Sequence, residues 1–211
     1  MAAMQDLCPV IVFAKAPVPG FAKTRLIPAL GAQGAARLAE RLLEEALRQA
    51  LASAIGPVLL CCTPDASHAA FKRMAQRFAV TLSLQGEGDL GQRMRRALDA
   101  ALQGHSRVVL IGTDAPRLDA AVLRQAADAL LGHDAVFGPA ADGGYTLVGL
   151  SRPAPDLFEG IAWSTPQVML QTRERIAQQR LRHAELAELH DIDEPADLVH
   201  LPHHWLTGLK E

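Results

Sequence analysis

Basic side chains gather around a short turn near the start of the chain. Lys15, Lys23 and Arg25 flank a stretch in which two prolines restrict the backbone and Gly20 permits a ligand to approach the main chain closely. Cations that converge on one turn suit an oligophosphate. The phosphate-binding patterns GxxxxGK[ST] and GxGxxG are absent. The loop is therefore either a phosphate site of another type or a solvated surface loop.

Acidic side chains occur at two later places where apolar runs end. Asp114 ends the run LIGTD, and Asp191 and Asp193 precede a proline near the C-terminus. Carboxylates at the end of a buried strand are natural ligands for Mg²⁺ or Mn²⁺. Residues two apart in an extended chain point the same way, so one of the two later acids can complete a metal site with Asp114. The structural alternatives are a turn cap at Asp114 and a helix N-cap at Asp193.

Two glycine-containing segments complete the set of chemically unusual loops. In residues 85–93, closely spaced glycines open a helix, and its free N–H groups at Gly91 together with Arg93 can meet a base or a phosphate. A flexible lead-in to the helix explains these glycines equally well. Residues 142–145, Asp-Gly-Gly-Tyr, form either a plain hairpin tip or open backbone against which a second substrate can lie.

Composition limits the classes of protein to which the chain can belong. Of its 211 residues 49% are hydrophobic, which excludes a disordered protein, and a formal net charge of −2 gives no reason to expect nucleic acid as a partner. Cys8, Cys61 and Cys62 form no CxxC pattern, so a reduced, cytoplasmic protein is the simplest interpretation. The N-terminus lacks a signal-peptide pattern, and no apolar run approaches the roughly 20 residues that span a bilayer.

The elements that must position these loops alternate between strand and helix. Expected strands cover residues 9–15, 58–63, 80–84, 107–112, 135–139 and 145–150, with an optional late strand at 182–186. Expected helices cover residues 32–54, 65–78 (with Asp65 able to cap it), 91–102, 118–131, 165–179 and a short one within 191–201. This order predicts a single α/β domain over residues 1–211, with three α-β-α layers and a mostly parallel central sheet. Ligands of such sheets lie at the carboxyl ends of the strands, where these loops fall.

Five stretches of the chain, taken in order, resemble the nucleotide-diphospho-sugar transferase superfamily with the GT-A fold. They are FAKAPVPGFAKTRL, GDLGQRM, IGTDAP, GPAADGGYTLVGL and DIDEPADL, and they extend over about residues 9–201. The chain is most similar to a bacterial family of arsenosugar-biosynthesis-type glycosyltransferases, and more distantly similar to molybdenum-cofactor and phospholactate guanylyltransferases. The resemblance implies that Lys23 and Arg25 hold phosphates and that Asp114 and Asp193 bind the metal. The Asp-x-Asp motif of many glycosyltransferases is only partial here, since Gly112 and Thr113 precede Asp114.

The expected site joins all of these loops. Its catalytic residues are Asp114, Lys23, Arg25 and Asp142; its nucleotide-binding residues are Lys15, Gly20, Lys23, Arg25, Gly91, Arg93 and Thr113; its acceptor-binding residues are Gly143, Gly144 and Tyr145; and Asp114 and Asp193 bind Mg²⁺ or Mn²⁺. We expect transfer of a glycosyl group from a nucleotide-diphospho-sugar to a small-molecule acceptor. Two alternatives stay open: a nucleotidyltransferase that releases pyrophosphate from a nucleoside triphosphate, and a nucleotide-binding protein without catalysis.

Overall fold

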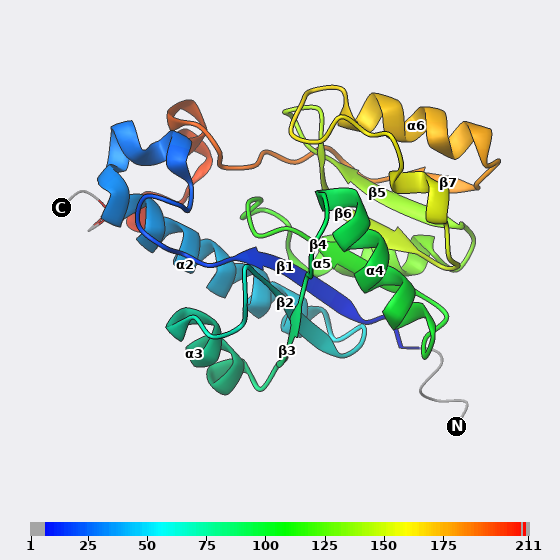
Figure 1. The fold of residues 1–211 in the computed structure, drawn as a ribbon, viewed down its shortest axis with the longest axis horizontal. Coiled ribbons are helices and arrows are strands. Elements are labelled where there is room, and N and C mark those ends of the chain that lie inside the picture. Colours follow the sequence, from blue (N-terminus) through cyan, green and yellow to red (C-terminus); the bar gives the residue numbers. More distant parts are fainter. Residues whose placement is uncertain (1–6, 208, 210–211) are drawn as a thin grey trace.

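Seven strands form one sheet in the order β3-β2-β1-β4-β6-β5-β7 (Figure 1). The structure, a computed structural model, describes residues 7–207 and residue 209; residues 1–6, part of the segment expected to lack a signal peptide, lie outside the described residues. The strands are β1 (Val10–Lys15), β2 (Val58–Thr63), β3 (Thr81–Leu84), β4 (Val108–Ile111), β5 (Ala135–Pro139), β6 (Tyr145–Leu150) and β7 (His183–Glu185). All run in one direction except β6, which is antiparallel to β4 and β5. The expected mostly parallel sheet and the late strand are confirmed.

Helices cover both faces of this sheet (Figure 1). They are α2 (Ile27–Ser53), α3 (Ala69–Phe78), α4 (Leu90–Leu102), α5 (Ala120–Ala129), α6 (Val168–Gln178) and α7 (His203–Leu206), with 3-10 helices η1 (Thr24–Leu26), η2 (Pro155–Phe158) and η3 (Pro195–His200). Val10 and Val12 of β1 pack with residues of α2, α3 and α5, whereas Ile11 and Phe13 pack with residues of α4 and α6. Side chains alternate along a strand, so a sheet buried on both faces requires this pattern. The expected three-layer architecture is confirmed. None of the described helices is both long and apolar enough to cross a bilayer.

A third hydrophobic cluster joins the first helix to the end of the chain. Leu38 and Leu42 of α2 pack with Ile192, Leu201 and Trp205 from the C-terminal segment. After β7 this segment crosses the edge of the sheet to reach the N-terminal half of α2 (Figure 1). The packing holds the acidic residues around position 192 at the edge of the sheet where the parallel strands end.

The antiparallel strand β6 brings a hairpin to the same edge. Leu150 at the end of β6 pairs with Val108 at the start of β4, so β6 must begin beside the carboxyl end of β4. The turn at residues 140–144 therefore lies next to the loop that follows β4. A short hairpin here replaces the helical crossover that a parallel connection needs.

The start of α3 differs from expectation. The helix begins at Ala69, and the side chain of His68 accepts a hydrogen bond from the backbone N–H of Ala70. Asp65 instead accepts a hydrogen bond of 2.6 Å from the backbone N–H of Ser67, in the preceding turn. The prediction that Asp65 caps this helix is wrong because Asp65 binds the nearest free N–H, two residues later, and the chain turns before the helix begins.

Two further helix boundaries differ. α2 begins at Ile27 instead of residue 32 and contains a kink at Gly31, whose φ of 71° is one that glycine adopts readily. The helix expected within residues 191–201 is the shorter η3, which Glu194 and Asp197 cap reciprocally. The alternative that Asp193 is the N-cap is therefore wrong, and its side chain is left for other contacts.

Asp119 caps the start of α5, the helix that follows the loop containing Asp114. Its Oδ1 accepts hydrogen bonds from the backbone N–H groups of Ala121 (2.9 Å) and Val122 (3.0 Å) at the start of α5. Asp119→Ala should lower the free energy of unfolding by about 1 kcal/mol in urea denaturation, since two helix N–H groups lose their partner. Asp128→Ala removes the same charge from the same helix without touching its first turn and should change stability little. Equal stability of the two variants would contradict the cap assignment.

Candidate functional site

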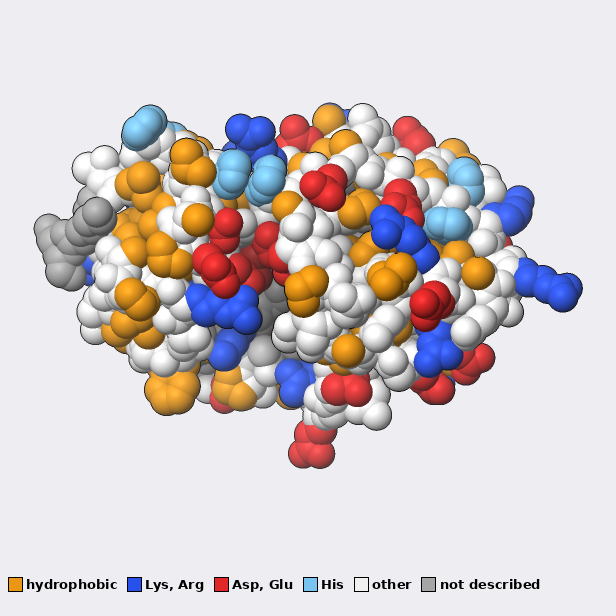
Figure 2. All heavy atoms as spheres, turned by 90° about the horizontal axis from the view of Figure 1, so that it is seen from above, with side chains coloured by type: hydrophobic (Ala, Val, Ile, Leu, Met, Phe, Trp, Pro, Cys, Tyr) orange, Lys and Arg blue, Asp and Glu red, His pale blue; other side chains and the backbone are white. Residues whose placement is uncertain are grey.

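A cleft of about 1120 Å³ opens at the carboxyl ends of the parallel strands. Its walls come from the loops after β1 and β4, the β5–β6 turn, the segment before α6 and the C-terminal segment. Figure 2 shows acidic side chains gathered beside Lys and Arg side chains around a hollow in this face. The cleft exceeds the roughly 300–1,000 Å³ typical of small-molecule sites, so it has room for more than one small substrate.

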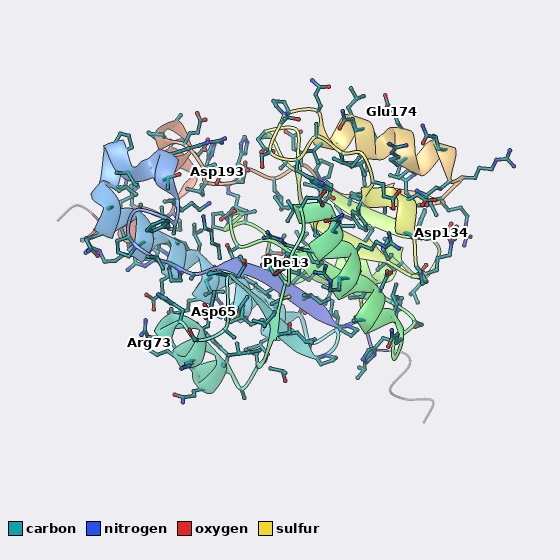
Figure 3. All side chains as sticks on the ribbon, viewed as in Figure 1. Phe13, Asp65, Arg73, Asp134, Glu174 and Asp193 are labelled. Carbon is teal, nitrogen blue, oxygen red and sulfur yellow. The ribbon has the colours of Figure 1, made fainter. Side chains whose placement is uncertain are left out.

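Lys23 binds both of the acids that the sequence assigns to a metal. Its ammonium nitrogen Nζ donates to Asp114 Oδ1 (2.5 Å), to Asp193 Oδ1 (2.8 Å) and to the backbone carbonyl of Ile192 (2.7 Å). The backbone N–H of Ile192 donates in turn to the carbonyl of Asp114 at 2.9 Å. Asp193 lies on the segment that crosses toward α2 (Figure 3). Three loops that are distant in sequence therefore meet at one ammonium ion.

The backbone of Lys23 adopts an unusual conformation to make these contacts. Its φ of 48° and ψ of 46° are left-handed, and η1 begins at the next residue. For a residue with a side chain this conformation costs roughly 1–2 kcal/mol. The side chain is only 9% exposed, and its two ion pairs and three hydrogen bonds offset both the backbone strain and the cost of burying the charge.

The residues that line the cleft include more carboxylates than cationic side chains. Burial disfavours the charged form of Lys23, but the Asp114 and Asp193 carboxylates outweigh it and raise the pKa of Lys23. Burial, and then repulsion from Asp142, raises the pKa of Asp191 from 3.8 to about 6, with smaller contributions from Asp193 and Asp114. Four carboxylates are thus close enough to interact, which leaves surplus negative charge beside the buried ammonium ion.

Two cations of the first loop reach the cleft with most of their donors free for a ligand. The Arg25 side chain is 62% exposed, and Glu194 approaches it only to 3.9 Å. Lys15 Nζ donates to the carbonyl of Phe21 at 2.8 Å, which uses one of the three N–H donors of an ammonium ion. Both side chains line the cleft. Gly20 adopts a φ of 82° within the turn and does not line the cleft.

The glycine-rich loop before α4 is ordered by side-chain caps. Asp89 and Gln92 form a capping box, so part of the free N–H set expected at this helix start is already used. A side chain at Gly91 would come within 2.6 Å of the Trp163 ring, so the absence of a side chain lets α4 pack closely against Trp163. Gly91 itself does not line the cleft. Arg93 lines the cleft, and its Nε donates to the carbonyl of Gly88 at 2.7 Å.

Gln85 lines the cleft, although no role is predicted for it from the sequence. Its side-chain amide nitrogen donates to the carbonyls of Ala14 (3.4 Å) and Cys61 (3.1 Å), near the ends of β1 and β2. Carbonyls cannot donate, so the orientation of the amide is fixed, and its oxygen is the atom that a ligand can meet. The side chain is 5% exposed. Only the three-dimensional neighbours of Gln85, and no sequence pattern, could have identified it.

The hairpin tip is held on both of its flanks. Asp142 Oδ1 accepts from the backbone N–H of Gly144 (2.7 Å), which is the local hairpin role considered for it. The carbonyl of Gly143 accepts from the N–H of Met169 (2.8 Å), and a side chain at Gly143 would lie 2.3 Å from the carbonyl oxygen of Pro166. Of the expected acceptor glycines, Gly144 lines the cleft and Gly143 packs against the segment before α6.

Tyr145 forms an aromatic wall together with Trp163. The Tyr145 ring packs edge-on against Phe137 (5.3 Å between centroids) and Trp163 (6.4 Å). Its hydroxyl is buried and has no hydrogen-bond partner among the described residues, and burial raises the pKa of Tyr145. Tyr145 and Trp163 line the cleft, so Trp163 contributes to the site as well as to packing.

The residues present fit a divalent cation in chemical type and in charge. Asp114, Asp142, Asp191 and Asp193 all line the cleft and present oxygen atoms, the donors that Mg²⁺ and Mn²⁺ favour. Burial is the main cause of the raised pKa of Asp191, but repulsion from Asp142, Asp193 and Asp114 also contributes, and a cation bound here would relieve that repulsion. Over residues 7–207, however, no group of three or more His, Cys, Asp or Glu side chains is close enough to hold an ion. Thr113 Oγ1 donates to the Asp114 oxygen that also binds Lys23, at 3.3 Å.

Comparison with known proteins identifies a matching family and a similar solved structure. A family described as "uncharacterized protein conserved in bacteria (DUF2064)" matches residues 45–165. A provisionally named nucleotide-diphospho-sugar transferase from Desulfovibrio desulfuricans G20 is 32% identical, with 90% of this chain and 84% of that chain covered and a TM-score of 0.83. A search of curated proteins gives no match.

More distant structures share the fold. The 4-diphosphocytidyl-2C-methyl-D-erythritol synthase of Anaerococcus prevotii is 10% identical, with 95% of this chain and 96% of that chain covered and a TM-score of 0.60. The glucosyl-3-phosphoglycerate synthase of Mycobacterium tuberculosis, in complex with Mn²⁺, uridine diphosphate and glucosyl-3-phosphoglycerate, is 11% identical, with 92% and 75% covered and a TM-score of 0.56. These matches confirm the nucleotide-diphospho-sugar transferase type of fold, and the finer family resemblances stay predictions.

Asp191→Asn should stabilise the protein at neutral pH when no metal is added. The folded-state pKa of about 6 lies above the unfolded value of 3.8, so the parent loses stability as the pH rises from about 4 to 6, whereas the variant carries no such charge. After allowance for solvent screening of this half-buried group, we expect a gain of about 1 kcal/mol at pH 7 and none at pH 3.5. Urea denaturation of the parent and the variant at both pH values measures this difference in the free energy of unfolding. A gain that does not depend on pH would contradict the assigned repulsion.

Proposed function

The chain belongs to the bacterial family described as uncharacterized protein conserved in bacteria (DUF2064), and we propose that it is a metal-dependent transferase acting on a nucleotide-activated substrate. The proposed reaction is glycosyl transfer from a nucleotide-diphospho-sugar to a small-molecule acceptor. The observation that carries this proposal is the meeting of Asp114 and Asp193 with the cations Lys15, Arg25 and Arg93 in one cleft at the carboxyl ends of the strands. The relative from Desulfovibrio desulfuricans supports the choice of donor class.

Asp114 and Asp193 would hold Mg²⁺ or Mn²⁺ in this reaction. The ion would supply positive charge beside the diphosphate, whose negative charge grows as the glycosyl bond breaks. Arg25 and Lys15 would bind the remaining phosphate oxygens, for which the planar guanidinium of Arg25 offers paired donors. Arg93 would bind the nucleotide from the opposite side of the cleft. Each of these side chains acts by stabilising charge that develops on the leaving group.

The acceptor would lie along the β5–β6 turn and the aromatic wall. Gly144 exposes backbone to the cleft, and Asp142 and Tyr145 flank it. The buried hydroxyl of Tyr145 lacks a partner among the described residues, so an acceptor atom that reached it would satisfy an otherwise unpaired group. Asp142 is the nearest candidate in this turn for removal of the acceptor's proton.

One observation keeps nucleotidyl transfer as the second candidate. Lys15, Arg25 and Arg93 line the same cleft, which is more cations than a diphosphate leaving group requires, and a nucleoside triphosphate would use all of them. In that reaction the acceptor attacks the α-phosphorus and pyrophosphate leaves. The similarity to the 4-diphosphocytidyl-2C-methyl-D-erythritol synthase of Anaerococcus prevotii is compatible with this candidate, but it shows only that the fold is shared.

Product analysis separates the two reactions. A panel of sugar nucleotides should yield nucleoside diphosphate only when Mg²⁺ or Mn²⁺ is present, slowly without an acceptor because water is a poor substitute. Asp114→Asn should reduce this rate by at least about 100-fold, since a metal ligand is lost, whereas Asp65→Asn, outside the cleft, should not. Pyrophosphate from a triphosphate with no turnover of sugar nucleotides would replace the proposal by its alternative. Tight nucleotide binding without either product would indicate a non-catalytic protein.

Arg25→Ala should weaken the binding of a sugar nucleotide by roughly 1.5–3 kcal/mol, the range expected for a hydrogen bond to a charged group. Isothermal titration calorimetry in the presence of metal measures the effect. Arg77→Ala is the matched control, because it removes an equally exposed arginine that pairs with Glu44, and neither of these two residues lines the cleft. If both variants bind as tightly as the parent, the loop after β1 is not the phosphate site.

A further inference from the structure

The ammonium ion of Lys23 is saturated by its contacts within the protein. An ammonium group has three N–H donors, and Lys23 directs them to Asp114 Oδ1, Asp193 Oδ1 and the Ile192 carbonyl, all within 2.8 Å. A phosphate oxygen could bind Lys23 only if at least one of these contacts broke. While these contacts hold, neither of the roles that the resemblance implies is available: Lys23 cannot bind a phosphate, and the two acids cannot bind a metal through these oxygens.

The same contacts restrict a metal ion. Asp114 Oδ1 and Asp193 Oδ1 are the carboxylate oxygens that face each other, and the lysine nitrogen stands between them. A divalent cation that bridged these oxygens would have to take the position of the ammonium ion. Two cations held side by side would repel each other strongly in a site where the lysine side chain is only 9% exposed.

We propose that Lys23 is an internal competitor for the metal, and that divalent cation binding to Asp114 and Asp193 displaces its ammonium ion toward the phosphates of the nucleotide. This inference rests on the proposed function, because it presumes that these two acids bind the metal. Lys23 lines the cleft, so its four-carbon side chain needs only rotations about single bonds to point into it. Arg25, two residues on, already lies there as an exposed cation.

The exchange couples the two ligands of the enzyme. Metal binding breaks the lysine contacts, and the released ammonium ion regains charge-assisted hydrogen bonds only when a phosphate is present. Each ligand therefore raises the affinity for the other by the same factor. Nucleotide without metal binds weakly, because Lys23 stays on the carboxylates.

Mn²⁺ titration of Lys23→Met tests the competition, with free ion followed by electron paramagnetic resonance and no nucleotide added. The apparent dissociation constant equals the intrinsic one divided by the fraction of protein that is competent to bind, so removal of an internal competitor tightens binding, and we expect a change of about tenfold. Lys15→Met is the matched control. It removes the same charge from the same cleft, but its ammonium ion donates to the Phe21 carbonyl and forms no ion pair with a described residue. We expect at most about a twofold change in that variant, from screened long-range charge.

The sign of the effect decides between competition and a permanent clamp. If Lys23→Met binds Mn²⁺ as tightly as the parent or less tightly, Lys23 only holds the acids in position and the proposal is wrong. In the variant, metal should also lose most of its effect on nucleotide affinity, which a purely structural role of Lys23 does not predict.

A second measurement uses the parent protein and stays informative if Lys23→Met does not fold. Acetic anhydride labels free amines, and mass spectrometry of peptides reports Lys23 and Lys15 separately. Mg²⁺ alone should speed labelling of Lys23, because its ammonium ion leaves the carboxylates, while Lys15 is labelled equally with and without metal. Unchanged protection of Lys23 at a Mg²⁺ concentration that saturates the protein overturns the exchange. If the parent binds neither Mn²⁺ nor Mg²⁺, with or without nucleotide, the proposed function itself has failed.

Discussion

The ion pairs of Lys23 connect the chain segments on which the geometry of the cleft depends. The lysine comes from the loop after β1, Asp114 from the loop after β4, and Asp193 from the segment that crosses to α2. Without this ammonium ion, two partly buried carboxylates would face each other with no counter-charge, which is an unfavourable arrangement in a protein interior. The packing of Ile192 on α2 and the hydrogen bond from its N–H to Asp114 support the same junction.

The sheet explains why chemically unusual loops converge on a single edge. Parallel strands end together, so the loops after β1 and β4 are neighbours whatever their sequences. The reversed strand β6 adds the β5–β6 turn to this edge, because a strand that runs backwards must begin where its neighbours end. The site is thus a consequence of strand direction, and the individual side chains determine only its charge.

Most of the fold could be predicted from the sequence, because alternating apolar runs of strand and helix length are local signals. The residue types of the site were also predictable, since Lys23, Arg25 and Asp114 stand at the ends of such runs. The pairing of Lys23 with the acids was not predictable, because it joins residues 170 positions apart through tertiary packing. The role of Gln85 was hidden for the same reason, and the cap of α3 was misassigned because Asp65 competes for a nearer N–H.

The position of Asp193 has a consequence for the biosynthesis of the protein. The strands β1 and β4 and the helices between them are complete by residue 111, yet Asp193, a partner of Lys23, follows that lysine by 170 residues. A nascent chain can therefore fold much of its sheet while Lys23 still lacks Asp193. The cleft acquires its full set of acids only when the C-terminal segment leaves the ribosome and packs on α2. A chain that stopped before Asp193 would then have most of its sheet but an incomplete site.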